Sequence, residues 1–132
     1  MPRTSPCTAA LRRGRLRKAG EFLEAAAQVA DRALADGELA NAYVTLCVLA
    51  GIAASDVICC ARLGLYARGE DHNEAVALAG RADGAAAGHL RVLLGMKTKA
   101  EYSESGMTAV DAKRAGRAAS SLVETARRVS AG

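Results

Sequence analysis

Apolar residues recur at helical spacing along most of this chain. The clearest pattern lies between residues 38 and 62, where the steps between apolar positions alternate between four and three: Leu39, Tyr43, Leu46, Ala50, Ala53, Val57 and Cys60. This alternation places them on one seam of a helix packed along most of its length. Gly64, just past the seam, suits a helix C-cap. The pattern therefore predicts a helix over 38–62.

Two further long helices are predicted, one on each side of this segment. A helix over 15–35 ends at Asp36-Gly37 and carries the apolar stripe Leu16, Leu23, Ala26, Ala30 and Leu34. The last helix follows a capping-box-like start at Thr108–Asp111 and presents Ala115, Ala118, Leu122, Ala126 and Val129. Both patterns are typical of amphipathic helices.

A third helix is predicted to begin after Asp71, with Glu74 at the position that reaches back to the cap. Glycines between residues 80 and 88 weaken it, because glycine costs about 1 kcal/mol relative to alanine in a helix interior. The apolar pattern resumes at Leu90 and continues to Tyr102. We expect one helix interrupted by a break or kink.

These elements predict an all-α fold, an up-and-down four-helix bundle with an interrupted third helix. Composition agrees, since the chain holds 31 Ala but only one Phe, three Tyr and no Trp, and sheets favour aromatic and β-branched residues. A length of 132 residues suits one core. We expect a helical domain over 15–130, preceded by a flexible basic arm over 1–14 that carries both prolines.

The net charge of +4 is unevenly distributed. Residues 1–20 hold six basic residues and no acid, while the rest of the chain holds 12 basic and 14 acidic residues. Basic N-terminal segments often bind nucleic acid, which makes candidates of Arg12, Arg13, Arg15, Arg17 and Lys18. The alternative is a solvated leader that only keeps the chain soluble.

The four cysteines form no CxxC motif and no metal-ligand spacing, so we expect free, buried thiols and a reducing, cytoplasmic location. No apolar segment follows the basic cluster, so no secretory signal is expected. The longest uncharged run, residues 39–55, is short for a membrane span. It is better interpreted as a core helix, and no membrane contact is expected.

Sequence motifs of the common catalytic sites, such as the P-loop and HExxH, are missing. A His-rich metal site is excluded because the chain has two histidines. The remaining candidate cluster holds Asp56, Arg62, Arg68, Asp71 and His72. Asp56 lies at the edge of the apolar seam, where a charge needs a partner. It either pairs with an Arg, such as Arg62 or one on a facing helix, or serves a site.

His72 is expected at the first position of the third helix, where the helix dipole disfavours the imidazolium form. A neutral imidazole there can accept a proton, and Arg68 can bind a phosphate in bidentate fashion. Together they suit RNA cleavage without a metal: the imidazole activates the ribose 2′-hydroxyl and the cation stabilises the phosphorane. A structural histidine at a helix start is the alternative.

Four segments together resemble the HEPN domain, a small helical fold of prokaryotic toxins and defence proteins. They are Asn41-Ala42-Tyr43 opening a small-residue helix, Arg68-Gly69-Glu70-Asp71-His72 before Glu74-Ala75-Val76, Leu93-Leu94 leading to Glu101-Tyr102, and the closing helix from Thr108. The likeness covers roughly residues 15–130 in order and helix count.

The resemblance implies a helical bundle that forms a homodimer, with paired sites facing each other at the interface. It also implies metal-independent RNase or RNase-toxin activity without a cofactor, and a partner such as RNA or an antitoxin. On the family's Arg/His pattern, His72 is the candidate base, Arg68 the phosphate ligand and Asp56 a supporting residue. Only three residues separate Arg68 from His72, which is shorter than the family's spacing. The alternative is a non-catalytic helical module that binds a protein partner or nucleic acid.

Overall fold

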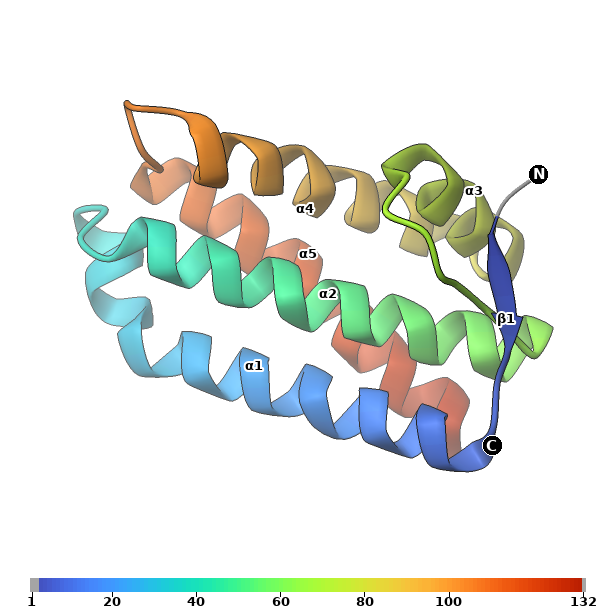
Figure 1. Cartoon of the computed structure of the whole chain (residues 1–132). Coiled ribbons are helices and arrows are strands. Elements are labelled where there is room, and N and C mark those ends of the chain that lie inside the picture. The colour runs from blue at the N-terminus through green and yellow to red at the C-terminus, as the bar shows by residue number, and fades with distance from the viewer. Residues whose placement is uncertain (1–2, 132) are drawn as a thin grey trace.

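The computed structural model describes residues 3–131. Figure 1 shows helices along almost the whole chain, with two short strands at one end. In chain order the elements are β1 (Thr4–Pro6), α1 (Ala9–Ala35), α2 (Ala40–Leu63), β2 (Leu65–Ala67), α3 (His72–Ala82), α4 (Gly84–Tyr102) and α5 (Ala109–Ala131). The helical class predicted from the sequence is confirmed.

The long helices α1, α2, α4 and α5 lie along one another, and each runs opposite to the long helix before it (Figure 1). The short helix α3 packs on α4 and α2, at the end of the molecule that also holds β1 and β2. The predicted break of the third helix is present. It falls at Asp83, whose carboxylate accepts hydrogen bonds from Ala85 N and Ala86 N and so starts α4.

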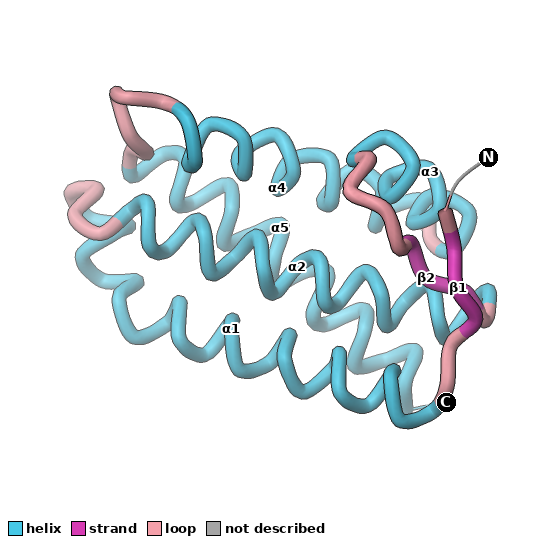
Figure 2. The backbone as a smooth tube through the Cα atoms, viewed as in Figure 1, coloured by secondary structure: helices cyan, strands magenta, loops and turns pink. Residues whose placement is uncertain are grey.

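The strands β1 and β2 were not predicted. They lie side by side (Figure 2) and pair antiparallel, with Thr4 opposite Ala67 and Pro6 opposite Leu65. Each strand has three residues, too few for a periodic signal, and the partners are far apart in sequence. This small sheet is the departure from an all-α architecture.

Helix α2 is the centre of the core and contacts α1, α3, α4 and α5. Residues on nearly all its sides are therefore buried, including Val44, Cys47 and Ile58, which lie off the predicted seam. Gly51 lies at a close approach of these helices, since a β-carbon there would meet Leu93 of α4 and Leu122 of α5. The chain uses glycine here because no side chain fits.

Helix α1 packs on α2 through small residues. Its fully buried positions are Ala19, Ala26 and Ala33, one every seven residues, while the leucines of the predicted stripe are only partly buried. Alanine at the line of contact lets the two helix backbones come close, and the leucines pack on either side.

The predicted helix ends are largely confirmed. Gly37 and Gly64 adopt positive φ values of 82° and 71° after α1 and α2, as C-terminal caps require. Asp71 caps α3. Thr108 and Asp111 form a reciprocal capping box, each accepting a hydrogen bond from the other's backbone nitrogen. Glu74, by contrast, accepts a hydrogen bond from Arg3 N and does not reach back to its own cap.

The flexible arm predicted over 1–14 is wrong for the residues that the structure describes; residues 1 and 2 lie outside them. Thr4–Pro6 form β1, and α1 begins at Ala9 because Thr8 accepts a hydrogen bond from Leu11 N. The first helix is thus six residues longer than its apolar stripe indicated. A helix cap is a local signal, and here Thr8 starts the helix before the first strongly apolar position.

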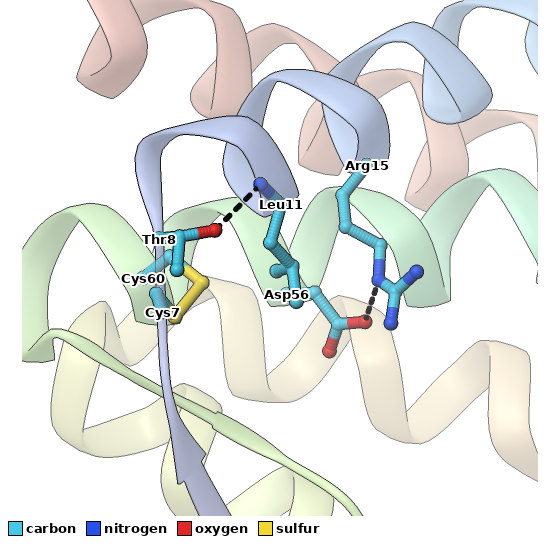
Figure 3. Close-up of a disulfide and its surroundings, with 6 residues drawn as sticks. All are labelled: Cys7, Thr8, Leu11, Arg15, Asp56 and Cys60. Atoms are coloured by element: carbon cyan, nitrogen blue, oxygen red, sulfur yellow. Dashed lines mark hydrogen bonds and ion pairs between the residues drawn. A yellow bond between two sulfur atoms is a disulfide. The ribbon is translucent and has the colours of Figure 1, made fainter.

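The expectation of free cysteines is wrong for two of the four. Cys7, which lies just before the cap of α1, forms a disulfide with Cys60 in the last turn of α2 (Figure 3). Cys47 and Cys59 are free and buried. The sequence held no signal for this pair, because 53 positions separate the two residues and neither lies in a cysteine motif.

Candidate functional site

A pocket of about 190 Å³ lies where α2, α4, the start of α3 and the loop after β2 meet. Its apolar lining includes Ile52 from α2 and Leu90 and Leu94 from α4. Its polar lining comes from all four segments: Ser55, Asp56, Cys59, Glu70, Asp71, His72 and Lys97. Three helices and one loop thus bring charged groups to one hollow.

Asp56 lines this pocket and is also ion-paired. Arg15 Nε donates to Asp56 Oδ2 at 3.1 Å, from the facing helix α1 (Figure 3). Of the partners considered from the sequence, the structure selects an Arg on a facing helix and not Arg62. Burial raises the pKa of Asp56 to about 6, an effect that outweighs the opposing influence of the Arg15 charge. The carboxyl therefore changes its charge close to neutral pH.

Arg15 is held in place on two sides. Besides its bond to Asp56, its guanidinium carbon lies 5.6 Å from the centre of the Tyr66 ring, a cation–π distance. Of the five residues predicted to bind nucleic acid, Arg15 is therefore engaged in contacts within the protein. Arg13, Arg17 and Lys18 are exposed and Arg12 is partly buried, all on the first turns of α1.

His72 is the first residue of α3, as predicted. Asp71 precedes it, and the Asp71 carboxylate accepts hydrogen bonds from Asn73 N and Glu74 N. The cap orients this turn, and the partly exposed His72 side chain lines the pocket together with Asp56. A second hollow next to it shares His72, Glu70 and Lys97. His72 thus stands between two concave surfaces.

Arg68 does not join this site. Its Nη1 donates to Ser5 Oγ of β1 at 3.2 Å, its side chain is exposed, and it is not part of the pocket lining. The structure therefore brings His72 and Asp56 to one pocket and places Arg68 on the small sheet. Arg68 and His72 are close along the chain but do not meet in the pocket, because the loop turns Arg68 toward β1.

Lys97 is the cation of the pocket, and it is not among the site residues predicted from the sequence. It comes from α4, lines the same two hollows as His72, and makes no hydrogen bond or ion pair with any other residue between 3 and 131. A signal existed in the helical spacing, because Lys97 follows Leu90 and Leu94 on the same face of its helix.

The other reactive side chain in the pocket is Cys59. Burial raises the pKa of its thiol to about 11, so the nucleophilic thiolate is scarce at neutral pH. Within residues 3–131 no group of three or more metal-ligating side chains comes together. The pocket therefore offers an imidazole, an ammonium group and a titrating carboxyl, which suit proton transfer and anion binding.

One helix, α2, is long and apolar enough to cross a membrane by length and composition, with a mean hydropathy of 2.1 over its most apolar window. Two thirds of that window is buried inside the fold. The buried central helix of a core has the same composition, so length and composition alone do not mark α2 as a membrane span.

Fold and site together define a helical protein with one small sheet and a polar pocket around His72. No protein-family model, curated protein or solved structure matches the chain.

Proposed function

We propose that this chain is a HEPN-like, metal-independent ribonuclease of the cytoplasm, with His72 as the general base. The observation that carries the proposal is the pocket in which His72, Lys97 and Asp56 meet. An imidazole and an unpaired ammonium group that line one pocket suit RNA cleavage by the ribose 2′-hydroxyl, as a general base and as a stabiliser of the developing negative charge.

In the proposed reaction, neutral His72 takes the proton of a ribose 2′-hydroxyl, and the 2′-oxygen attacks the adjacent phosphorus. The Lys97 ammonium group binds the phosphate and stabilises the negative charge that develops on it. The bond to the 5′-oxygen breaks, and that oxygen takes a proton from solvent. The products are a 2′,3′-cyclic phosphate and a 5′-hydroxyl end.

Glu70 and Glu101 line the hollows that Lys97 also lines, but among the described residues Lys97 forms no ion pair with a carboxylate. Asp71 is occupied by the α3 cap and Asp56 by Arg15. Asp56 then has a supporting role, because it holds α1 against the pocket. Arg68, the ligand implied by the family resemblance, is replaced in this proposal by Lys97.

We test this with purified protein, a 5′-labelled single-stranded RNA and excess EDTA. Wild type is expected to give cyclic-phosphate ends, whereas His72→Ala loses about 10²–10⁴-fold in rate, the usual range for a general base. His89→Ala is the matched control, since it removes the other histidine of the chain. Lys97→Met is expected to lose activity and Arg68→Gln to keep it.

Unchanged circular dichroism at 222 nm is required of each variant. Cleavage by His72→Ala at the wild-type rate rules out this base. Cleavage of an RNA whose 2′-hydroxyl is removed at the target position rules out the proposed chemistry.

We further propose a homodimer through the α2–α4 face next to the pocket. Leu49 is 39% exposed and Tyr102 is 79% exposed on this side, and Lys97 lies in hollows beside both residues. Light scattering after size-exclusion chromatography is expected to give twice the chain mass for wild type and the single mass for Leu49→Asp. A monomeric wild type contradicts the dimer.

The second candidate is a non-catalytic module that binds RNA or a protein partner such as an antitoxin. The bond of Arg68 to Ser5 favours it, because the family's Arg/His pair is not assembled. Under this alternative the RNA is bound but not cleaved, and His72→Ala binds as tightly as wild type.

A further inference from the structure

The segment before α1 contacts β2, the loop that follows β2 and the first turn of α3, which are next to the pocket. Its strand β1 pairs with β2, Arg68 N donates to Arg3 O at 2.8 Å, and Arg3 N donates to the Glu74 carboxylate at 3.4 Å. Two-stranded ribbons of this length are marginal in water. We call residues 3–7 the N-terminal tether.

The N-terminal tether supports the loop that leads to His72. A β-carbon at Gly69 would lie 3.3 Å from Arg3 Cδ, so the Arg3 side chain packs directly on the loop backbone. Gly69 and Ala67 are both part of the pocket lining. The tether therefore backs the wall that carries Glu70, Asp71 and His72.

One covalent bond holds the tether in place. Cys7, its last residue, is bonded to Cys60 of α2, and Cys7 N donates to Gly64 O at 3.0 Å. Cys60 lies one helical turn beyond Asp56, so the disulfide and the Arg15–Asp56 ion pair are successive links between α1 and α2 (Figure 3). Cys7 is partly exposed, whereas Cys60 is buried, so Cys7 is the more accessible end of the disulfide.

We propose that the Cys7–Cys60 disulfide is a reversible redox switch that sets how firmly the loop carrying His72 is held. In the disulfide form the tether is closed on β2 and Gly69. In the dithiol form β1 leaves β2, and the pocket wall loosens. The control of RNA cleavage by this switch rests on the proposed function. The release of β1 and the loosening of the loop do not depend on that function.

The chemistry balances with a dithiol reductant. One of its thiolates attacks Cys7 Sγ, the Cys7–Cys60 bond breaks, and Cys60 leaves as a thiolate that takes a proton. The second thiol of the reductant then displaces Cys7, which is also protonated. Two electrons and two protons pass to the protein, and the reductant becomes a disulfide. In reducing compartments such disulfides are usually transient and regulatory.

The test is hydrogen exchange by mass spectrometry on four proteins, each with and without dithiothreitol: wild type, Cys7→Ser, Cys60→Ser and Cys59→Ser. In wild type and Cys59→Ser, reduction is expected to speed exchange over residues 65–75 by about tenfold or more. Residues 44–58 of α2 serve as the internal reference and stay unchanged. Cys7→Ser and Cys60→Ser exchange fast without reductant and do not respond to it.

Three outcomes overturn the switch. The first is four reactive thiols in denatured wild type after treatment with oxidised glutathione, which means that no disulfide forms. The second is an equal rate of hydrogen exchange over residues 65–75 in both redox forms. The third is an increase in the exchange rate of α2 as large as that of the loop. RNA cleavage is measured in parallel and is expected to fall about tenfold on reduction. Redox-dependent exchange without cleavage in either form rejects the ribonuclease and leaves the switch standing.

Discussion

At the scale of single residues, Asp56 connects the core to the pocket. It is mostly buried, with 17% of its side chain exposed, and it pairs with Arg15 of another helix. Burial disfavours the carboxylate and Arg15 favours it, and the first effect is the larger. The folded protein therefore binds a proton at Asp56 more tightly than an unfolded chain does.

This raised pKa predicts a stability change with pH. Because the folded pKa of about 6 lies above the ordinary value, the contribution of Asp56 to stability is full below about pH 4. It is lost as the pH rises through 6. The free energy of unfolding of wild type is expected to fall by roughly 2–3 kcal/mol relative to Asp56→Asn between pH 4 and 7. Urea unfolding at several pH values measures the free energy of unfolding of both proteins. The same dependence on pH in the two proteins contradicts the prediction.

Gly51 predicts a steric effect in the core. Gly51→Ala places a methyl group against Leu93 and Leu122 and is expected to lower the free energy of unfolding by about 1–3 kcal/mol. Gly95→Ala is the matched control, since that helical glycine has no neighbour within 4 Å. The control is expected to gain up to about 1 kcal/mol from helix propensity. Equal urea midpoints for the two variants contradict this packing.

At the scale of elements, the junction between α3 and α4 depends on one side chain. Asp83 ends α3 with its own N–H, bonded to Ala79 O, and starts α4 with its carboxylate. The same junction sets where α4 begins and hence where Lys97 meets the pocket. Glycines at 80, 84 and 88 weaken a continuous helix but do not by themselves choose the point of the break.

Removal of this cap is expected to destabilise the protein. Asp83→Ala leaves Ala85 N and Ala86 N without their side-chain acceptor, at a cost of about 1 kcal/mol. Asp31→Ala, an exposed position inside α1, is the control and is expected to be neutral or slightly stabilising. Thermal unfolding followed by circular dichroism compares them. A loss no larger than the control's shows that the carboxylate is not needed at this junction.

At the scale of the whole molecule, the exposed basic residues are divided among several helices, and the N-terminal group of them lies on the first turns of α1. Arg13 and Arg17 lie one turn apart on the surface, and Lys18 is exposed beside them. Arg15 is not available, because Asp56 holds it. The nucleic-acid contact that the sequence predicts at these residues would therefore be a helical surface and not an extended arm.

This surface predicts a salt effect on RNA binding. Arg13→Gln/Arg17→Gln is expected to weaken binding of a single-stranded RNA and to reduce the slope of log K against log salt by roughly 1–1.5, since each lost phosphate contact removes about 0.7. Lys113→Gln/Arg117→Gln on α5 is matched in charge, spacing and exposure. Fluorescence anisotropy at several salt concentrations gives both slopes. Equal slopes in the two variants remove α1 from the RNA contact.

The sequence by itself determined the features that depend on neighbours along the chain. Helical periodicity located the long helices, and short-range signals at Gly37, Gly64, Asp71 and Thr108 located most of their ends. These signals can be read locally because a helix closes its hydrogen bonds within four residues. His72 at the start of α3 belongs to this group, and so does the interruption near Gly80–Gly88.

Only the tertiary structure decided which distant groups meet. It paired Cys7 with Cys60, Arg15 with Asp56 and β1 with β2, and it turned Arg68 toward Ser5 while Lys97 took its place beside His72. Each of these pairings depends on how the helices pack and on which distant segments they bring together. A single charged or sulfur-bearing side chain has no sequence signal that identifies its partner. The apolar pattern indicates which face of a helix is buried, but the packing of the whole chain determines which neighbour that face contacts.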